Sequence, residues 1–304
     1  MEPEAAETSP ELDARHLVAG ASLLAATANV IMQLARPEVG YAVVESTVES
    51  AQLMRHPVRR WLTTVTYLSV ALMGTPAERA AVRRMINRSH AQVRSGAGSP
   101  VVYSAFDPGL QLWIAACLYQ GTVDVQTALR GPADEQTADD MYQVARWFGS
   151  TLQMPGELWP ADREAFRSYW ETELASVRID PPVRDYLGQL LRLAYLPSPL
   201  CSVLGPVNQF LTTGFLSPPF RDQMGLPWTD REQRQFDAVL RAVAMINRVM
   251  PGPARRFPFN ACLVSWRCRR LLRGNPFGIL NAAPPPPAAA AVWSARTRSP
   301  RAAN

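Results

Sequence analysis

The sequence predicts an all-α protein whose folded part is a single globular domain. Apolar residues recur at helical spacing along most of the 304 residues, and no alternating pattern of the kind that marks strands recurs. Prolines separate the periodic stretches, as expected of helix starts and connections. Because 47% of the residues are apolar, the chain can bury a sizeable core. We place the helical domain at residues 15–275, between an acidic N-terminus (1–14) expected to be flexible and a basic, Pro/Ala-rich tail (276–304) expected to be disordered.

The first predicted helix is the uncharged run "LVAGASLLAATANVIMQLA" at residues 17–35. It ends before Arg36-Pro37, because the residue before a proline disfavours the α region. The run is about long enough to span a bilayer, but acidic residues precede it where a signal peptide would have a positive region. Asn29 and Gln33 would also be costly in lipid. We therefore expect a buried helix, with a membrane-spanning helix as the alternative.

The remaining helices follow from helix-start and helix-stop residues. One is expected from Pro57, which suits a first turn, to Gly74, which suits a C-cap. Asp107 and Pro108 form a typical cap and first turn, and they predict the start of another helix. Further helices are predicted at residues 76–93, 134–155, 162–176, 182–196, 229–249 and 258–273, with proline pairs at 181–182 and 218–219 marking connections.

Charge and cysteine content argue against several functional classes. The net charge is +5, every basic residue is arginine, and 26 acidic residues are interspersed with the 31 basic ones. A dedicated nucleic-acid binder concentrates its positive charge on one face, so we expect no nucleic-acid partner. The four cysteines are widely spaced and form no C-x-x-C pair. We expect buried, reduced thiols and a cytoplasmic protein.

The helix predicted from Pro57 carries an unusual polar face. Arg60 and Thr64 lie one turn apart on an otherwise apolar helix, and Tyr67 and Ala71 continue the same face. A buried guanidinium needs an anionic or strongly polar partner. Alternatively, Arg60 lies near the helix end and extends its charge into water. Periodicity alone leaves both interpretations open.

His90 is one of only three histidines and lies in the arginine-rich stretch "RRMINRSHAQVRS". On a helix it flanks the apolar stripe, beside Ile86 and Val93. Such a residue can be a hydrogen-bonded structural histidine, but neutral imidazole is also the commonest metal ligand and a usual axial ligand of haem iron. The motifs of zinc proteases, serine hydrolases, P-loops and dinucleotide-binding domains are absent. If the chain carries chemistry, one axial histidine for haem is the most economical way to supply it.

Four segments, taken in order, resemble one family. They are "HPVRRWLTTVTYLSVALMGT", "VRRMINRSHAQVRS", "VYSAFDPGLQLW" and "MYQVARWFGSTLQMPGELWPADREAFRSYW". Together they give an Arg-x-x-x-Thr helix ending in Gly-Thr, a histidine six residues after an arginine, a Y-x-A-x-D-P segment with a downstream tryptophan, and a tyrosine-rich helix pair. This order and spacing resemble the MpaB and latex-clearing (rubber) oxygenase family over about residues 20–260.

The resemblance implies an all-α, globin-like fold around haem b, with O2 used to cleave carbon–carbon double bonds of polyisoprenoid substrates. It places the proximal haem ligand, and so the iron, on His90. It places the family's arginine and threonine near the haem pocket on Arg60 and Thr64, as cofactor-binding and catalytic residues. The family's candidate base is a glutamate upstream of that arginine, and Glu45 is our assignment for it. Since the sequence shows no secretory signal, an intracellular lipid, terpenoid or aromatic prenyl chain fits better than polymeric rubber.

The first hypothesis is therefore a haem b-dependent oxygenase that uses O2 on an unsaturated hydrophobic substrate. The alternative is a non-catalytic helical protein of the same fold that binds haem or a hydrophobic ligand. A third hypothesis is a membrane-associated protein that uses residues 17–35 as an anchor and the arginine-rich region 255–273 on acidic headgroups.

Overall fold

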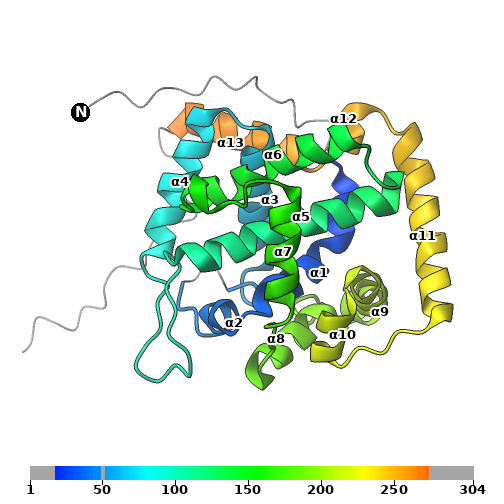
Figure 1. Ribbon diagram of the computed structural model, residues 1–304, viewed down its shortest axis with the longest axis horizontal. Coiled ribbons are helices and arrows are strands. Elements are labelled where there is room, and N and C mark those ends of the chain that lie inside the picture. The colour runs from blue at the N-terminus through cyan, green and yellow to red at the C-terminus, as the bar shows by residue number, and fades with distance from the viewer. Residues whose placement is uncertain (1–17, 49–51, 274–304) are drawn as a thin grey trace, which may run out of the picture.

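Helices make up almost the whole of the computed structural model, which describes residues 18–48 and 52–273 (Figure 1). The 3₁₀-helices are η2 (Gly20–Ala25) and η4 (Gly156–Leu158). The α-helices are α1 (Ala26–Leu34), α2 (Pro37–Val44), α3 (Pro57–Met73), α4 (Pro76–His90), α5 (Pro108–Arg130), α6 (Glu135–Leu152), α7 (Arg163–Leu174), α8 (Pro181–Leu191), α9 (Ser198–Phe215), α10 (Pro218–Met224), α11 (Asp230–Val249), α12 (Gly252–Arg255) and α13 (Phe259–Arg273). Within the described residues the only extended pairing is an isolated bridge between Arg94 and Ser104. The predicted all-α fold with one globular domain is confirmed, and the predicted termini 1–14 and 276–304 lie outside the described residues.

Proline and capping residues set the helix starts. Proline is the first residue of α2, α3, α4, α5, α8 and α10, where its missing N–H costs nothing. Thr75 and Glu78 form a reciprocal capping box on α4, and Thr229 and Glu232 form another on α11. Asp107 accepts hydrogen bonds from the first turn of α5, as predicted.

Four of the described helices were missed, and others are shorter than predicted. α2 begins at Pro37, α9 includes Pro206 inside the helix, and α12 is a single short turn. The proline pair 218–219, predicted as a connection, is the first turn of α10, because proline suits that position. The Ser, Pro and Gly content of 198–206 is typical of a loop, but α9 packs against α1, α8 and η2, and this packing outweighs the local propensity. The helix predicted at 76–93 ends at His90, and the one predicted at 182–196 ends at Leu191.

The apolar run predicted as one helix over 17–35 is two elements, η2 and α1, in the core. Asn29 Nδ2 donates to the carbonyl of Cys117 on α5 at 2.6 Å, and Gln33 Nε2 donates to Asn29 Oδ1 at 2.7 Å. α5 has a glycine at the contact, where a Cβ on Gly121 would lie 2.4 Å from Asn29 Nδ2. No described helix combines the length and the hydropathy needed to cross a membrane.

α5 crosses the middle of the molecule and separates two apolar clusters (Figure 1). One cluster joins α5 to α1, α2 and α8. In it Trp113 is fully buried, stacks on Trp170 at 5.3 Å and donates to the carbonyl of Gln33. The second cluster lies between α5, α6 and α7 and is rich in aromatic rings, including Tyr119, Tyr142 and Phe166. α3 packs against α4, α6 and α13, so the ends of α3, α4 and α6 are held relative to one another.

The cysteines are all free. Cys117 and Cys262 are buried, as expected, but Cys268 is exposed and Cys201 is half-buried. The prediction of buried thiols is therefore wrong for Cys268, because this residue lies on the outward side of α13 rather than on the side that packs against α3.

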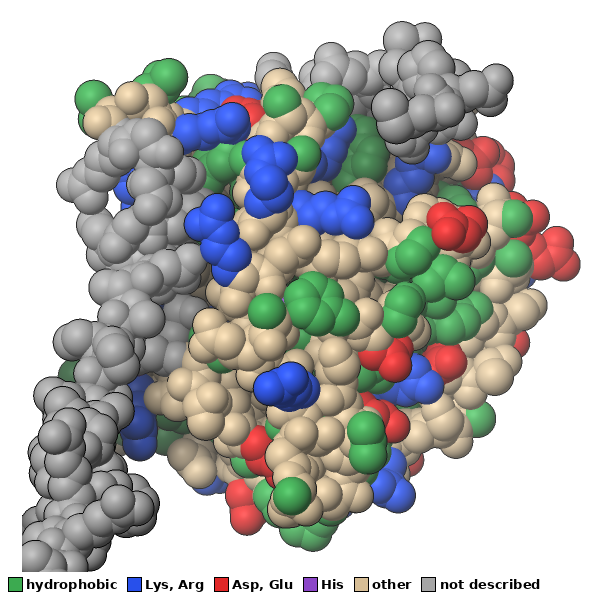
Figure 2. All heavy atoms as spheres, turned by 90° about the vertical axis from the view of Figure 1, so that its left-hand side faces the viewer, with side chains coloured by type: hydrophobic (Ala, Val, Ile, Leu, Met, Phe, Trp, Pro, Cys, Tyr) green, Lys and Arg blue, Asp and Glu red, His purple; other side chains and the backbone are tan. Residues whose placement is uncertain are grey.

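Figure 2 shows the side of the molecule on which α4 lies. Arginine side chains gather over the upper part of this face, with hydrophobic and acidic side chains beside them. α4 itself contributes the exposed Arg83, Arg84 and Arg88. The polar side of α4 thus faces solvent, whereas Val82 on its other side is fully buried.

Candidate functional site

His90 is the last residue of α4, and the start of that helix is held firmly. Glu78 completes the capping box and accepts two hydrogen bonds from Arg267 of α13, at 2.7 and 2.8 Å. These bonds hold the pKa of the Glu78 carboxyl below its usual range. Val82 of α4 lies in one buried cluster with Trp266 of α13. The end of α4 is thereby placed against the end of α6.

The imidazole of His90 contacts an amide and a phenyl ring. Its Nδ1 lies 3.1 Å from Oε1 of Gln153, the residue that caps the C-terminus of α6. Its ring meets that of Phe106 edge-on, with the centroids 6.3 Å apart. His90 Nε2 has no hydrogen-bond partner among the residues that the structure describes.

Gln153 is the centre of a cluster of amides. Its Oε1 also lies 2.8 Å from Nε2 of Gln111 on α5, and its Nε2 donates to Oδ1 of Asn87 on α4. Gln111 is buried, and its Nε2 lies 2.7 Å from the carbonyl oxygen of Ala105. The cluster therefore ties α4, α5 and α6 together directly beside His90.

The surroundings of His90 favour its neutral form. Burial lowers the pKa of the imidazole, and the positive charge of Arg60 lowers it further, while the hydrogen bond to Gln153 acts in the opposite direction. His90 is consequently a neutral imidazole at pH 7. Neutral imidazole is the form that binds metal.

Arg60 lies in the first turn of α3, close enough to His90 for its charge to shift the pKa of that histidine. Protein closely surrounds the guanidinium, although the residue as a whole is only partly shielded from solvent. Burial lowers the pKa of Arg60, and Tyr186 of α8 is the neighbouring ionisable group that opposes this effect. The guanidinium makes no ion pair or hydrogen bond with the described residues. The residue is partly exposed, so the structure leaves both interpretations of Arg60 open: a cation that needs an anionic partner, or one that extends toward water.

Thr64 follows Arg60 by one turn and is exposed. Its hydroxyl donates to the carbonyl of Arg60 at 3.0 Å, so the donor is used within the helix and the oxygen remains available as an acceptor. One turn further, Tyr67 donates to the carbonyl of Phe148 at 2.7 Å, and Ala71 is fully buried. The predicted polar face thus runs from the open end of α3 into its core.

Glu45 lies at the C-cap of α2 and is exposed. Its Oε2 accepts a hydrogen bond from the hydroxyl of Tyr103 at 2.8 Å. Burial, together with this carboxylate, raises the pKa of Tyr103 to about 12. Glu45 is not among the charges that shift the pKa of Arg60 or His90. The structure therefore links Arg60 to His90 but does not link Glu45 to either, and the role of Glu45 as a base stays a prediction.

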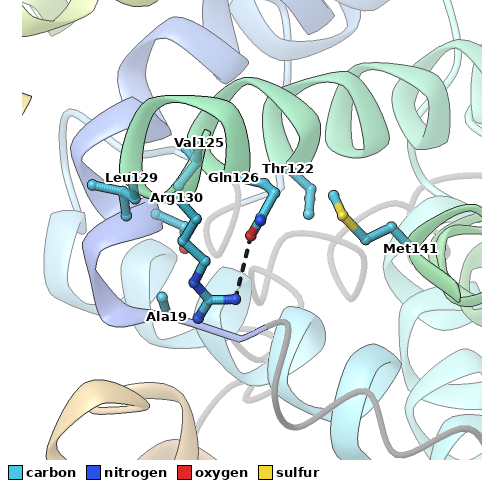
Figure 3. A pocket seen from close by; sticks show the side chains of 8 residues that line it. Ala19, Thr122, Val125, Gln126, Leu129, Arg130 and Met141 are labelled. Atoms are coloured by element: carbon cyan, nitrogen blue, oxygen red, sulfur yellow. Dashed lines mark hydrogen bonds between the residues drawn. The ribbon is translucent and has the colours of Figure 1, made fainter. Parts of the chain in front are cut away.

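A surface hollow lies elsewhere on the molecule (Figure 3). It has a volume of about 360 Å³ including its open mouth, and it lies beside the C-terminal half of α5. Arg130 lines it and donates to Oε1 of Gln126 at 3.3 Å. None of the four predicted site residues lines this hollow.

Sequence reasoning missed the residues that surround His90. These are Asn87, Gln111 and Gln153, and beside Arg60 the sequence reasoning also missed Tyr186. Gln111 had a detectable signal, since it is an amide in the apolar run "GLQLWIAAC" and lies two residues before the predicted buried Trp113. Gln153 and Tyr186 had none, because single polar residues near helix ends are common. Across the described residues, no three histidine, cysteine or acidic side chains gather as a possible metal site.

Known proteins resemble this chain over most of its length. A protein of Mycobacterium bovis and a protein of Mycobacterium tuberculosis, both described as uncharacterised, are each 48% identical to it over 247 residues, covering 81% of this chain and 97% of each relative. The structure of latex clearing protein in the closed state aligns with 88% of this chain and 76% of that chain, with 15% identity and a TM-score of 0.49. Residues 14–245 match the family described as ER-bound oxygenase mpaB/B'/rubber oxygenase, catalytic domain. This match confirms the predicted resemblance: the chain belongs to the mpaB/rubber oxygenase catalytic-domain family.

Proposed function

We propose that the protein is a haem b-dependent oxygenase that uses O2 on an unsaturated hydrophobic substrate, such as an isoprenoid or lipid-like chain. Membership of an oxygenase family supports an oxidoreductase. The single observation that carries the haem assignment is the pair of His90 and Arg60: an imidazole whose Nε2 has no hydrogen-bond partner lies near a partly exposed cation that has no anionic partner among the described residues.

The residues present fit the chemistry of haem b. Iron needs a neutral nitrogen donor, and His90 Nε2 is one. A propionate needs a cation, and the planar donors of Arg60 suit a carboxylate. The porphyrin needs apolar contacts, and the ring of Phe106, which is 44% exposed, lies against His90.

In this proposal each residue has a limited task. His90 would hold the iron, and Arg60 would neutralise a propionate. Bound haem supplies the activation of O2. The partly exposed ring of Phe106 beside His90 is the apolar contact that the site offers to an unsaturated chain. Thr64 offers its oxygen as an acceptor at the mouth of the site.

One observation favours the second candidate function, a haem- or hydrophobic-ligand-binding protein without catalysis. The proposed base Glu45 is engaged by Tyr103 and has no interaction with Arg60 or His90. If no other group supplies a base, the chain could still hold haem. Consumption of O2 in the presence of substrate separates the two functions.

The first experiment is an absorption spectrum of the purified protein, with haem quantified per chain, beside His90→Ala. His56→Ala is the matched control, because His56 is the other described histidine and lies before α3. We expect about one haem per chain and a Soret band in the wild type and in His56→Ala, and loss of both in His90→Ala. If the wild-type protein takes up no haem after reconstitution, the proposal is wrong.

The second experiment measures O2 uptake by the haem-loaded protein with isoprenoid hydrocarbons and unsaturated lipids. Uptake that depends on the double bonds, with saturated analogues as controls, supports the oxygenase. Stable haem binding without any uptake supports the non-catalytic alternative.

A further inference from the structure

The hydrogen bonds around His90 determine which ring nitrogen carries the proton. The carbonyl oxygen of Ala105 can only accept, so the atom of Gln111 that lies 2.7 Å from it must be the donor Nε2. That same nitrogen lies 2.8 Å from Gln153, so the atom of Gln153 facing it must be the acceptor Oε1. The main chain at Ala105 therefore fixes the orientation of both amides.

The orientation of Gln153 then fixes the tautomer of His90. The same Oε1 lies 3.1 Å from His90 Nδ1, and an amide oxygen cannot donate. Nδ1 must therefore carry the proton, and the lone pair of the neutral ring is left on Nε2. The amide nitrogen of Gln153 is consistent with this orientation, because Nε2 donates a hydrogen bond to Oδ1 of Asn87, one turn before His90.

This arrangement leaves one polar atom of Gln111 without a hydrogen bond within the described part of the chain. Its Oε1 is buried and has no hydrogen-bond partner among the described residues. An unpaired buried acceptor is unfavourable, and an apolar side chain at this position in α5 would avoid it. The amide at position 111 is thus better explained by its donor, which orients Gln153, than by its contribution to the core.

We infer that Gln111 and Gln153 are positioning residues that hold the proton of His90 on Nδ1 and present Nε2 as the ligand atom for haem iron. Partners of this kind fix the ring orientation and raise the basicity of a ligating histidine. The inference rests on the proposed function only for the identity of the group that Nε2 binds. The tautomer itself follows from the protein alone.

The tautomer can be measured without haem. Long-range ¹H–¹⁵N spectra distinguish the two ring nitrogens, and with three histidines in the chain His90 is assigned by comparison with His90→Gln. The protein is produced in a haem-deficient host as wild type, Gln153→Met, Gln111→Met and Gln153→Glu. Gln143→Met is the matched control, since Gln143 is an exposed glutamine on the same helix.

We expect the proton on Nδ1 in the wild type, in Gln143→Met and in Gln153→Glu, whose carboxylate still accepts. Gln153→Met should move it to Nε2, and Gln111→Met should give a mixture, because Gln153 can then turn over. A wild-type proton on Nε2, or an unchanged spectrum in Gln153→Met, overturns the inference.

Haem titration of the same proteins tests the consequence for ligation. Gln153→Met should bind haem about tenfold more weakly than the wild type, and Gln153→Glu should restore the affinity. Equal affinities in all variants would overturn the role in ligation. If the tautomers follow the expected pattern but no protein binds haem, the proposed function fails while the hydrogen-bond relay to His90 stands.

Discussion

The polar groups at the two ends of α6 differ in whether they have hydrogen-bond or ion-pair partners. In its N-terminal half, Tyr142 donates to the carbonyl of Pro160 at 2.5 Å, and Arg163 pairs with Asp139 and Glu135. At its C-terminal end, the Gln153 cluster satisfies Nδ1 of His90 but leaves Nε2 unused, and Arg60 close by lacks an anionic partner among the described residues. Polar groups at the first end are paired with one another, whereas the second end includes a histidine nitrogen and a cation without a partner among the described residues.

The difference between the two ends predicts different responses to substitution. Changes in the N-terminal half should alter the free energy of unfolding without altering haem binding. Changes at the C-terminal end should alter haem binding with little loss of stability.

The largest expected effect is that of Phe166→Ala. Phe166 is 4% exposed, and its ring centroid lies 4.7 Å from that of Tyr119 and 5.6 Å from that of Trp159. Truncation leaves a cavity in the aromatic cluster and should lower the free energy of unfolding by about 3–5 kcal/mol, measured by urea denaturation. Haem per folded chain should not change; a specific loss of haem would mean that the two ends of α6 are not independent.

Tyr142→Phe should cost about 1 kcal/mol, because the partly buried hydrogen bond from its hydroxyl to the carbonyl of Pro160 is lost. Tyr119→Phe is the control within the same cluster, since its hydroxyl makes no hydrogen bond with the described residues. Thermal melts of both variants test the point. If the two variants melt alike, the hydrogen bond of Tyr142 does not stabilise this end of α6.

Arg60→Met should act in opposite directions on stability and on binding. Removing a closely surrounded cation without a partner should leave the haem-free protein as stable as the wild type or more so. Haem affinity should fall about tenfold, or ~1.4 kcal/mol. Arg59→Met removes the same charge one position away, so an equal loss of affinity in both variants would show a general charge effect and not a propionate contact.

The smallest expected effect is that of Asp124→Asn, and it depends on pH. Burial raises the pKa of Asp124 from 3.8 to about 6, although Gln120 donates a hydrogen bond to it. The native state keeps this proton over a range where the unfolded state has lost it, so the stabilisation is present below pH 4 and is lost as the pH rises through about 6. Asparagine should therefore raise the free energy of unfolding by about 1 kcal/mol at pH 8 and hardly at pH 4.

Denaturation of Asp124→Asn at the two pH values checks this expectation, and an equal gain at both would contradict it. The variant also provides a comparison with Arg60. Asp124 of α5 is a partly buried charge without a counter-ion among the described residues, and we expect its removal to leave haem binding unchanged, unlike the removal of Arg60.

The fold was largely predictable because most helix boundaries are determined by residues close to them in sequence. Thr75-Pro76 and Thr229 with Glu232 mark helix starts within a few residues, and Asp107-Pro108 does the same for α5. α9 could not be predicted, because the packing that keeps Pro206 inside a helix comes from α1, α8 and η2. Local signals do not report such contacts.

The site was predictable only in part. His90 and Arg60 were selected through the resemblance to a family, and periodicity alone left both with ordinary explanations. The role of Gln153 could not be predicted, since this residue is separated in sequence from His90 by 63 positions and from Gln111 by 42. Pairings at that distance follow from how α4, α5 and α6 pack, which a pattern of residue types does not specify.

The close contact of α1 with α5 has a consequence for how the protein is made. Asn29 of α1 donates to the carbonyl of Cys117, which lies 88 positions later, and the close approach needs a residue without a side chain at Gly121. During synthesis this apolar segment leaves the ribosome long before its partner does. Until α5 has been made, Asn29 lacks its hydrogen-bond acceptor and the apolar segment lacks part of its cover, so this segment depends on a helix that emerges much later.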